Sequence, residues 1–570
     1  MAGSAGAGAA PDEQGVAGVA TGDDEASPPS GAESPSGPSS RWRQPDRAPV
    51  AALLVAFAAL GVYQTTLLPG LGYWDTAEAQ TVLPLLGTMH PTGFPAFVVI
   101  GWLFSIVTAP LGQPAFLMNL MAATCAAVAA GGTVLIARRL HVPLPIAAAA
   151  GIGFALTPIV WHISSAADAH ALHIALVVAL TLALLRWKAL VDGRRDRPGD
   201  AAYRRRGDRA VVLAAAIYGV AAANHGLALI LAPSIVLFVL AVEPRVLSRP
   251  RLVLAAVGTA LGVAALLYLE LPLRAGLLRA PLVYGHPETW SGFWAIVLAK
   301  QFQGDLNMLA DLPGKFWALA RLASDQYGPL LALVPVGLLV TAVKQPKYAL
   351  FSRTAVLVTV VFANSYANAD ITRYYLGPAF FVWTWLAILA AAVVEAILRR
   401  AGTHEADLDE LDGEPSVALP GRRRLAIPPA VALAFAAALL VPTALGLSAR
   451  WTTADQPADS GAQAWLDQAF GTMRPNAVVI SWWSYSTPMW YGRDVEHRRP
   501  DLLIIDDSNR VWDQLGSVPD VIDRYLGTRP VYVIRQSDLD IQTLAQRYAI
   551  QPVRRPGNLF LVTGRLGTTP

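Results

Sequence analysis

Two carboxylates, Asp75 and Glu78, directly follow the first long apolar run of the chain. An ionisable group at the edge of a hydrocarbon layer costs free energy unless it is solvated, paired or used in function. A close acidic pair at a membrane face is therefore a candidate catalytic site, in which Asp75 could act as a general base. The structural alternative is that both residues only cap an interfacial helix.

Further polar side chains lie at the ends of other apolar runs, whereas charges in the middle of these runs are nearly absent. The set comprises His90, His162, Asp168, His170, His173, Asn224, His225, Glu270, Arg274, Asp370 and Arg373. A secondary transporter normally holds its substrate near the bilayer midplane, but an enzyme that acts on a lipid substrate needs its polar groups at one interface. The pattern favours the enzyme. A transporter or flippase for a lipid-linked glycan is the alternative, and a non-catalytic scaffold is a third reading.

Two parts of this set have simpler explanations. His170 and His173 are three residues apart beside Asp168, so they could bind a metal, but such groups are more often hydrogen-bonded structure. We predict no metal. Asn224 and His225 fall in a tight turn between two apolar runs, where polar side chains could simply satisfy free backbone groups.

The composition determines which elements must position these residues. The chain has 570 residues, of which 54% are hydrophobic and 15% charged, too apolar for one water-soluble core. We predict a polytopic all-α membrane protein with about eleven spans. These lie near residues 48–68, 115–137, 143–161, 170–187, 210–224, 226–242, 252–269, 328–343, 354–367, 376–398 and 427–448. The net charge of only +3 argues against a nucleic-acid partner.

Lysine and arginine are retained in cytoplasmic loops, and their spacing gives the orientation of the spans. Basic clusters recur every second span, which predicts a cytoplasmic N-terminus and a C-terminus outside the plasma membrane. The short apolar run at residues 94–108 would break this parity. We therefore place it as a re-entrant or juxtamembrane helix within a long external loop, residues 69–113, that also carries the acidic pair.

Two regions flank the membrane domain, which we expect to span residues 47–449. Residues 1–46 are polar and aperiodic, so we predict a disordered cytoplasmic tail. Residues 450–570 read as a small extracytoplasmic α/β domain with strands at 477–481, 502–506, 530–535 and 559–562. Its aromatic residues Trp482, Trp483, Tyr485, Trp490 and Tyr491 could stack on sugar, rest on the membrane or pack in the core. The domain has no glycine-rich phosphate fingerprint, and the single Cys125 allows no internal disulfide.

Several motifs, in order, resemble one membrane-protein family, known as domain of unknown function 2723, which includes a transmembrane protein O-mannosyltransferase. The matching stretches are Gly72 to Glu78, His90 to Pro95, Ala167 to Leu172, Ala223 to Gly226, Tyr268 to Arg274 and Gly285 to Thr289. The resemblance covers residues 48–310 and extends more loosely to Arg373 to Tyr375 and Arg499 to Ile505. The chain departs at Asp168 and His170, where the family usually has Glu and Tyr.

The resemblance implies an inverting glycosyltransferase of the C superfamily, GT-C. Its donor would be a polyprenyl-phosphate-linked hexose, most often mannose, and its acceptor an extracytoplasmic protein hydroxyl or glycan. No cofactor is implied. Asp75 and Glu78 would be catalytic, and Arg274, Arg373 and His90 would bind the donor phosphate, although both arginines could instead snorkel to lipid headgroups. Asp168, His170, Asn224, His225 and Tyr374 would bind the acceptor or line the cavity. The Ala-rich and Arg-rich composition indicates a bacterium.

Overall fold

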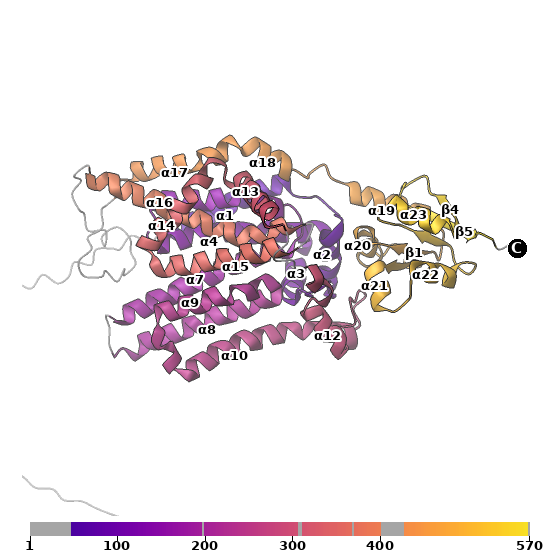
Figure 1. Ribbon diagram of the computed structural model, residues 1–570, viewed down its shortest axis with the longest axis horizontal. Coiled ribbons are helices and arrows are strands. Elements are labelled where there is room, and N and C mark those ends of the chain that lie inside the picture. Colours follow the sequence, from indigo (N-terminus) through magenta and orange to yellow (C-terminus); the bar gives the residue numbers. More distant parts are fainter. Residues whose placement is uncertain (1–46, 196–198, 306–310, 367–369, 401–426, 568–570) are drawn as a thin grey trace, which may run out of the picture. The chain divides into compact units, whose positions relative to one another are not determined.

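The computed structural model describes residues 47–195, 199–305, 311–366, 370–400 and 427–567, and most of them are helical (Figure 1). The expected tail at residues 1–46 lies outside this part of the chain. Within the described residues, seven helical segments are long and apolar enough to cross a membrane, or up to nine if two bent helix pairs each form one span. The chain is a multi-pass membrane protein.

The seven segments are α1 (Ala48–Thr66), α4 (Pro114–Arg139), α7 (Ala169–Arg195), α10 (Pro250–Tyr268) with its continuation to Leu277, α13 (Leu312–Tyr327) with α14 (Val334–Lys344), α15 (Pro346–Ser365) and η7 (Ile371–Tyr375) with α16 (Leu376–Arg400). The bent pairs are α5 (Leu144–Ala155) with α6 (Pro158–Ser164), at 63°, and α17 (Pro429–Leu445) with α18 (Leu447–Ala454), at 53°. The expected number of eleven spans is thus not confirmed. The two remaining runs, 210–224 and 226–242, are helical, but the first belongs to an arginine-rich helix and the second is short.

The remaining helical elements of this region connect the spans, flank them or, as with α11, η4 and η6, lie within them. They are α2 (Trp74–Leu85), α3 (Pro95–Thr108), η1 (Ala109–Leu111), α8 (Ala201–Asn224), η2 (Gly226–Leu231), α9 (Ala232–Val242), η3 (Pro244–Ser248), α11 (Glu270–Pro272), the π-helical turn η4 (Leu273–Leu277), α12 (Trp290–Val297), η5 (Lys300–Asp305) and η6 (Gly328–Leu333). The expected external loop, residues 69–113, thus contains α2, α3 and the short η1. The run at residues 94–108 forms α3, which packs against α2 and α4.

Small residues let the helices approach closely, as is common in membrane proteins. α4 packs along α1, and a Cβ atom at Gly131 of α4 would lie only 2.6 Å from the carbonyl oxygen of Ala52 in α1. A larger residue at position 131 would therefore separate the two helices. The core around this contact is made largely of alanine, valine and leucine side chains from α1, α4, α5, α7 and α16.

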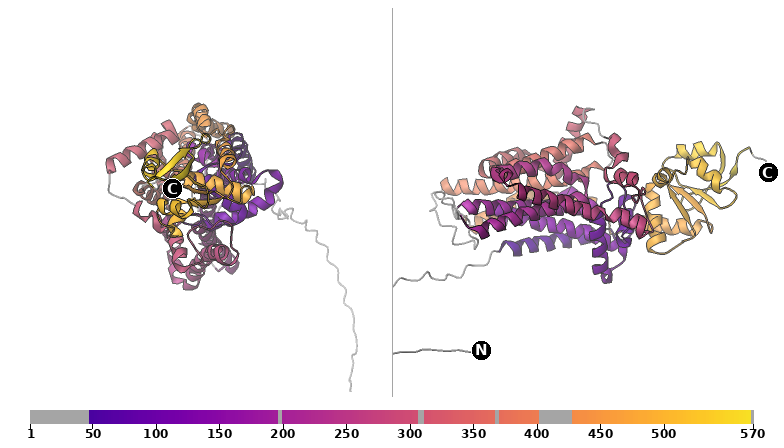
Figure 2. Two further views of the ribbon diagram at one scale, coloured as in Figure 1. Left: turned by 90° about the vertical axis from the view of Figure 1, so that its right-hand side faces the viewer. Right: turned by 90° about the horizontal axis from the view of Figure 1, so that it is seen from below.

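The C-terminal region folds around one five-stranded sheet, whose order is β2-β1-β3-β5-β4. Its strands are β1 (Val478–Ser481), β2 (Leu503–Asp506), β3 (Val531–Val533), β4 (Tyr548–Pro552) and β5 (Phe560–Arg565). β1 pairs in parallel with β2 and β3, and β5 pairs antiparallel with β3 and β4. The yellow strands of the sheet can be followed in Figure 2. The helical elements of this region are α19 (Gly461–Thr472), α20 (Trp483–Trp490), the π-helical turn η9 (Tyr491–Val495), α21 (Asp507–Trp512), α22 (Val518–Tyr525) and α23 (Asp538–Ala545).

This α/β region packs directly against α2, α3 and α4 of the membrane region. Trp490 and Tyr491, both 2% exposed, share one hydrophobic core with side chains from α2, α3 and α4. Polar contacts join the same surfaces, because the Tyr491 hydroxyl accepts from the Ala115 backbone N–H at 3.2 Å and the Tyr73 hydroxyl donates to the Gly461 carbonyl at 3.1 Å. For Trp490 and Tyr491, the structure therefore supports the core-packing reading of the aromatic cluster.

Candidate active site

A buried amide network fixes the start of α2, on which both acidic residues lie. The Gln80 side chain accepts from the Gly72 N–H at 2.9 Å and donates to the Asn119 side-chain oxygen at 2.9 Å. The Asn119 oxygen also accepts from the Ala167 N–H at 2.9 Å. Because both side chains are fully buried and fully bonded, the network ties α2 to α4 and to the segment that carries Asp168.

Glu78 and His90 form a tight buried pair. The Glu78 carboxylate accepts from the His90 backbone N–H at 2.7 Å, and its other oxygen makes a short hydrogen bond with the ring Nδ1 of His90. Glu78 has a side-chain exposure of only 1%, compared with 16% for His90. Glu78 is therefore placed to orient and charge His90 rather than to contact a substrate itself.

Arg373, from η7, bridges two aspartates that lie far apart in the sequence. Its Nη2 donates to Asp75 at 2.9 Å and its Nη1 donates to Asp168 at 3.0 Å. A forked guanidinium can hold two carboxylates in this way, and ionic hydrogen bonds are stronger than neutral ones. The second Asp168 oxygen bonds to the Nδ1 and the backbone N–H of His170, at 2.8 and 2.6 Å.

The α/β region supplies the remaining partner of Asp75. The indole N–H of Trp483, at the start of α20, donates to the Asp75 Oδ1 at 3.0 Å. The Trp483 ring also meets His90 edge to face, with a centroid distance of 5.5 Å. Trp483 follows the carboxyl end of the parallel strand β1 by two residues, which is the usual place for functional side chains in α/β folds.

These contacts set the charges of the group. Burial would raise the pKa of Asp75, but the positive charges of His90 and Arg373 and the hydrogen bond from Trp483 hold it below its ordinary value. Burial would likewise raise the pKa of Asp168, yet His170 and Arg373 lower it. For His90, burial alone would lower the pKa, whereas Glu78 and Asp75 outweigh it and raise the pKa to about 9. At neutral pH the site thus holds two aspartate anions between two cations.

A second group of polar residues adjoins the first through His170. The His170 ring stacks on Tyr374 at 5.2 Å and lies 4.4 Å from the His225 ring, centroid to centroid. Asn224 donates to the Ala169 carbonyl at 3.2 Å. The Nε2 of His170, the Nδ1 of His173 and the Oδ1 of Asn224 are buried and have no partner among the described residues. The five predicted acceptor-side residues are therefore brought together.

Other members of the expected set do not join this site. Arg274 donates to the Leu85 carbonyl at 2.9 Å and to the Leu86 carbonyl, which places it at the C-terminal end of α2, where a cation complements the helix dipole. Glu270 is buried, and neither of its carboxylate oxygens has a hydrogen-bond partner among the described residues. His162 is exposed. Asp370 is the exception, because its side chain, although 61% exposed, forms an ion pair with the Arg373 Nε at 3.6 Å.

Among the described residues, one group has the spacing of a cation site. Asp75, Glu78 and His90 each offer a ligand atom, and these atoms lie within 4.8 Å of one another. A divalent cation bound to His90 would require the ring to be neutral, so the ring would first have to lose the second proton that makes it a cation in this site. The absence of a metal requirement therefore stays a prediction, to be tested by chelation.

The hydrogen bond from Trp483 to Asp75 was not predicted from the sequence. The aromatic run after β1 is visible in the sequence, but a bond across 408 positions has no local signal. Trp482 and Tyr485 contact Trp74 and Tyr73 at ring centroid distances of 4.9 and 5.8 Å, so this part of the aromatic cluster packs onto the start of α2.

Comparison with known proteins finds a family match over part of the chain and a similar fold. Residues 75–248 match the family model described as the protein O-mannosyl-transferase TMEM260 N-terminal domain, which confirms the resemblance over a stretch that begins at Asp75 and includes Asp168 and His225. No curated protein matches the chain. The structure is similar to that of ArnT from Cupriavidus metallidurans bound to undecaprenyl phosphate, with 16% identity, a TM-score of 0.55, and 90% of this chain and 97% of that chain covered. ArnT in the apo state aligns with 15% identity, a TM-score of 0.55, and 90% and 98% coverage.

Proposed function

Because the chain resembles the O-mannosyltransferase-like family and has a GT-C fold, we propose that it is a membrane glycosyltransferase. It moves a hexose, by resemblance mannose, from a polyprenyl phosphate to an acceptor hydroxyl outside the cytoplasm. One observation carries this proposal, namely the bridge from Asp75 through Arg373 to Asp168, which gathers a base and its counter-ion at one end of the helices. The undecaprenyl phosphate bound to ArnT supports the donor class.

Asp75 is the general base of the proposed reaction. Its side chain is 32% exposed, compared with 14% for Asp168 and 1% for Glu78, so it is the carboxylate of the three that an acceptor can reach most easily. Its lowered pKa keeps it ionised. The acceptor oxygen loses its proton to Asp75 and attacks the anomeric carbon while the bond from that carbon to the phosphate oxygen breaks. Polyprenyl phosphate leaves on the opposite face, which inverts the configuration.

The leaving phosphate gains negative charge and needs a cation. His90, charged at neutral pH, and Arg373 serve this purpose beside Asp75. Arg274 was expected to share the role, but two of its guanidinium nitrogens already donate to backbone carbonyls. We therefore assign Arg274 to the stability of α2 and propose that it reaches the phosphate only indirectly.

The group around His170 lines the acceptor side of the proposed cavity. The unpaired Nε2 of His170 can donate a hydrogen bond to a hydroxyl group when the ring is protonated or accept one when it is neutral, and the amide oxygen of Asn224 can accept one. This chemistry suits a sugar or a serine or threonine side chain. The site faces outward in the proposed topology, with the N-terminus in the cytoplasm and the α/β domain outside the plasma membrane.

The competing function, a transporter or flippase of a lipid-linked glycan, shares the cavity but forms no glycosidic bond. Purified full-length protein in detergent is incubated with radiolabelled polyprenyl-phosphate mannose and a library of serine- and threonine-containing peptides and simple glycosides. We expect label on a water-soluble acceptor. Label that stays on lipid with every acceptor, together with movement of intact donor across reconstituted vesicles, would establish the transporter instead.

A further inference from the structure

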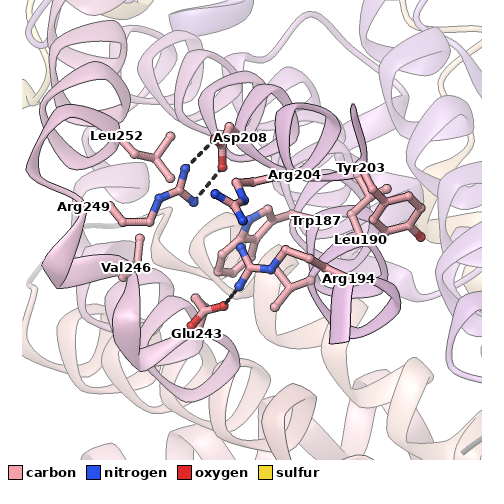
Figure 3. A pocket seen from close by; sticks show the side chains of 12 residues that line it. Trp187, Leu190, Arg194, Tyr203, Arg204, Asp208, Glu243, Val246, Arg249 and Leu252 are labelled. Carbon is pink, nitrogen blue, oxygen red and sulfur yellow. Dashed lines mark hydrogen bonds and ion pairs between the residues drawn. The ribbon is translucent and has the colours of Figure 1, made fainter. Parts of the chain in front are cut away.

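A cluster of arginines lies far from the candidate active site, at the C-terminal end of α7 and the N-terminal end of α8. The opposite ends of these two helices carry His170 and Asn224 of the site. Figure 3 shows two ion pairs in the arginine cluster, which join helices that are neighbours in the bundle. Arg249 donates from both terminal nitrogens to Asp208 of α8, at 2.8 and 2.5 Å. Arg194 of α7 pairs with Glu243. These two arginines are therefore neutralised within the protein.

Three other arginines at the same place lack such a partner. Arg204 lies between the two ion pairs in Figure 3, and no described carboxylate forms an ion pair with it, with Arg209 or with Arg251. All three side chains are exposed. A group of like charges at a membrane interface is stabilised by an anionic partner.

A shallow groove lies between α8 and the start of α10 and combines these charges with an apolar wall. Its volume is about 440 Å³, and it is lined by Asp208, Arg209, Val212, Arg249, Arg251, Leu252 and Ala255. Three arginines against one aspartate leave the polar end positive. The apolar wall continues along α10, none of whose residues is buried and whose Leu254, Val257 and Leu261 are 71%, 52% and 66% exposed.

We propose that this groove binds one anionic glycerophospholipid. Arg209 and Arg251 hold the phosphate, the Arg249 and Asp208 pair closes the floor, and an acyl chain lies along Val212, Leu252 and the exposed face of α10. A soluble anion would use only the charged end, whereas the adjoining apolar wall fits a ligand that carries its own hydrocarbon. The site is independent of sugar transfer.

The test is native mass spectrometry of the purified full-length protein with dioleoylphosphatidylglycerol or dioleoylphosphatidylcholine. Wild-type protein should retain one phosphatidylglycerol in clear preference to phosphatidylcholine. Each lost arginine should weaken binding about fivefold, so Arg209→Gln with Arg251→Gln should weaken it roughly 25-fold. The matched control is Arg205→Gln with Arg206→Gln, which removes equal charge from α8, the helix that carries Arg209, but from residues that do not line the groove. The control should bind as the wild type does.

Three results would overturn the proposal. Equal losses in both double variants would mean that only the overall charge matters. Equal retention of both lipids by the wild type would exclude phosphate recognition by charge. Displacement of the lipid by millimolar glycerol 1-phosphate would identify a soluble-anion site instead. The lipid comparison and the displacement use wild-type protein, so they decide the matter even if a variant fails to fold.

Discussion

Replacing Trp483 with Phe removes a single N–H from the environment of Asp75 and keeps an aromatic ring against His90. The lost hydrogen bond, 3.0 Å long, has a charged acceptor. Such bonds contribute about 1.5 to 3 kcal/mol, and because Asp75 is 32% exposed, water can replace part of the interaction. We therefore take the lower end, about 1.5 kcal/mol, which corresponds to roughly a tenfold change in an equilibrium constant.

The sign of the effect follows from the state that the bond stabilises. Trp483 helps to hold the pKa of Asp75 below its ordinary value, so its loss raises that pKa and moves the acid limb of the kcat/KM profile to higher pH. On the acid side, transfer by Trp483→Phe should be about tenfold slower than by the wild type. At pH well above the limb Asp75 is ionised in both proteins, and the difference should shrink.

The assay measures transfer from radiolabelled polyprenyl-phosphate mannose over a range of pH. Trp482→Phe is the control, because the neighbouring indole N–H is buried without a partner among the described residues. It should leave the acid limb in place. An unchanged limb in Trp483→Phe, with melting temperatures equal to that of the wild type, would refute the idea that the α/β domain tunes the base.

Two further predictions concern the site, and a third concerns His286, whose ring bonds to Glu288 at 3.0 Å and to Asp513 at 2.8 Å outside it. Arg373→Gln leaves Asp75 and Asp168 without their shared cation and takes a positive charge away from the leaving phosphate. Loss of one such group lowers a rate by about 10² to 10³, so transfer should fall about a hundredfold while Arg373→Lys recovers part of it; equal loss in both variants would show that the positive charge of residue 373 is not what transfer requires. Chelation with EDTA should leave the initial rate unchanged, and restoration of a lost rate by Mn²⁺ would instead place a cation at the Asp75 group. Hydrogen bonds to Glu288 and Asp513 raise the pKa of His286, so the protonated ring stabilises the fold at low pH and this stabilisation is lost as pH rises through the folded-state pKa. The melting temperature of His286→Gln should therefore lie below that of the wild type at low pH and approach it at alkaline pH. A difference in melting temperature that does not change with pH would contradict this.

Individual residues of the site could be predicted because their position relative to the apolar runs is visible in the sequence. Asp75, Asp168 and Asn224 stand at the ends of apolar runs, and polar groups at helix ends on one side of a membrane must share an interface. Four strands of the α/β domain were equally visible as short apolar runs. The fifth, β4, was missed because it lies at the sheet edge, where its outer residues are exposed and its last residue is Pro552.

Tertiary pairings could not be predicted. Arg274 and Arg373 have similar positions after apolar runs, yet one donates to carbonyls of α2 and the other joins two aspartates. Which partner each arginine finds depends on where α2 ends relative to η4 and η7. Only the packed structure determines this. The same holds for Trp483, whose partner lies in another region of the chain.

The central claim is that Asp75 removes a proton from the acceptor. The most direct test is single-turnover transfer by the Asp75→Asn variant, with donor binding measured separately by equilibrium dialysis. We predict that this near-isosteric change lowers the rate by at least a thousandfold while the donor still binds. A rate within tenfold of that of the wild type would contradict the account, because an amide cannot act as a base.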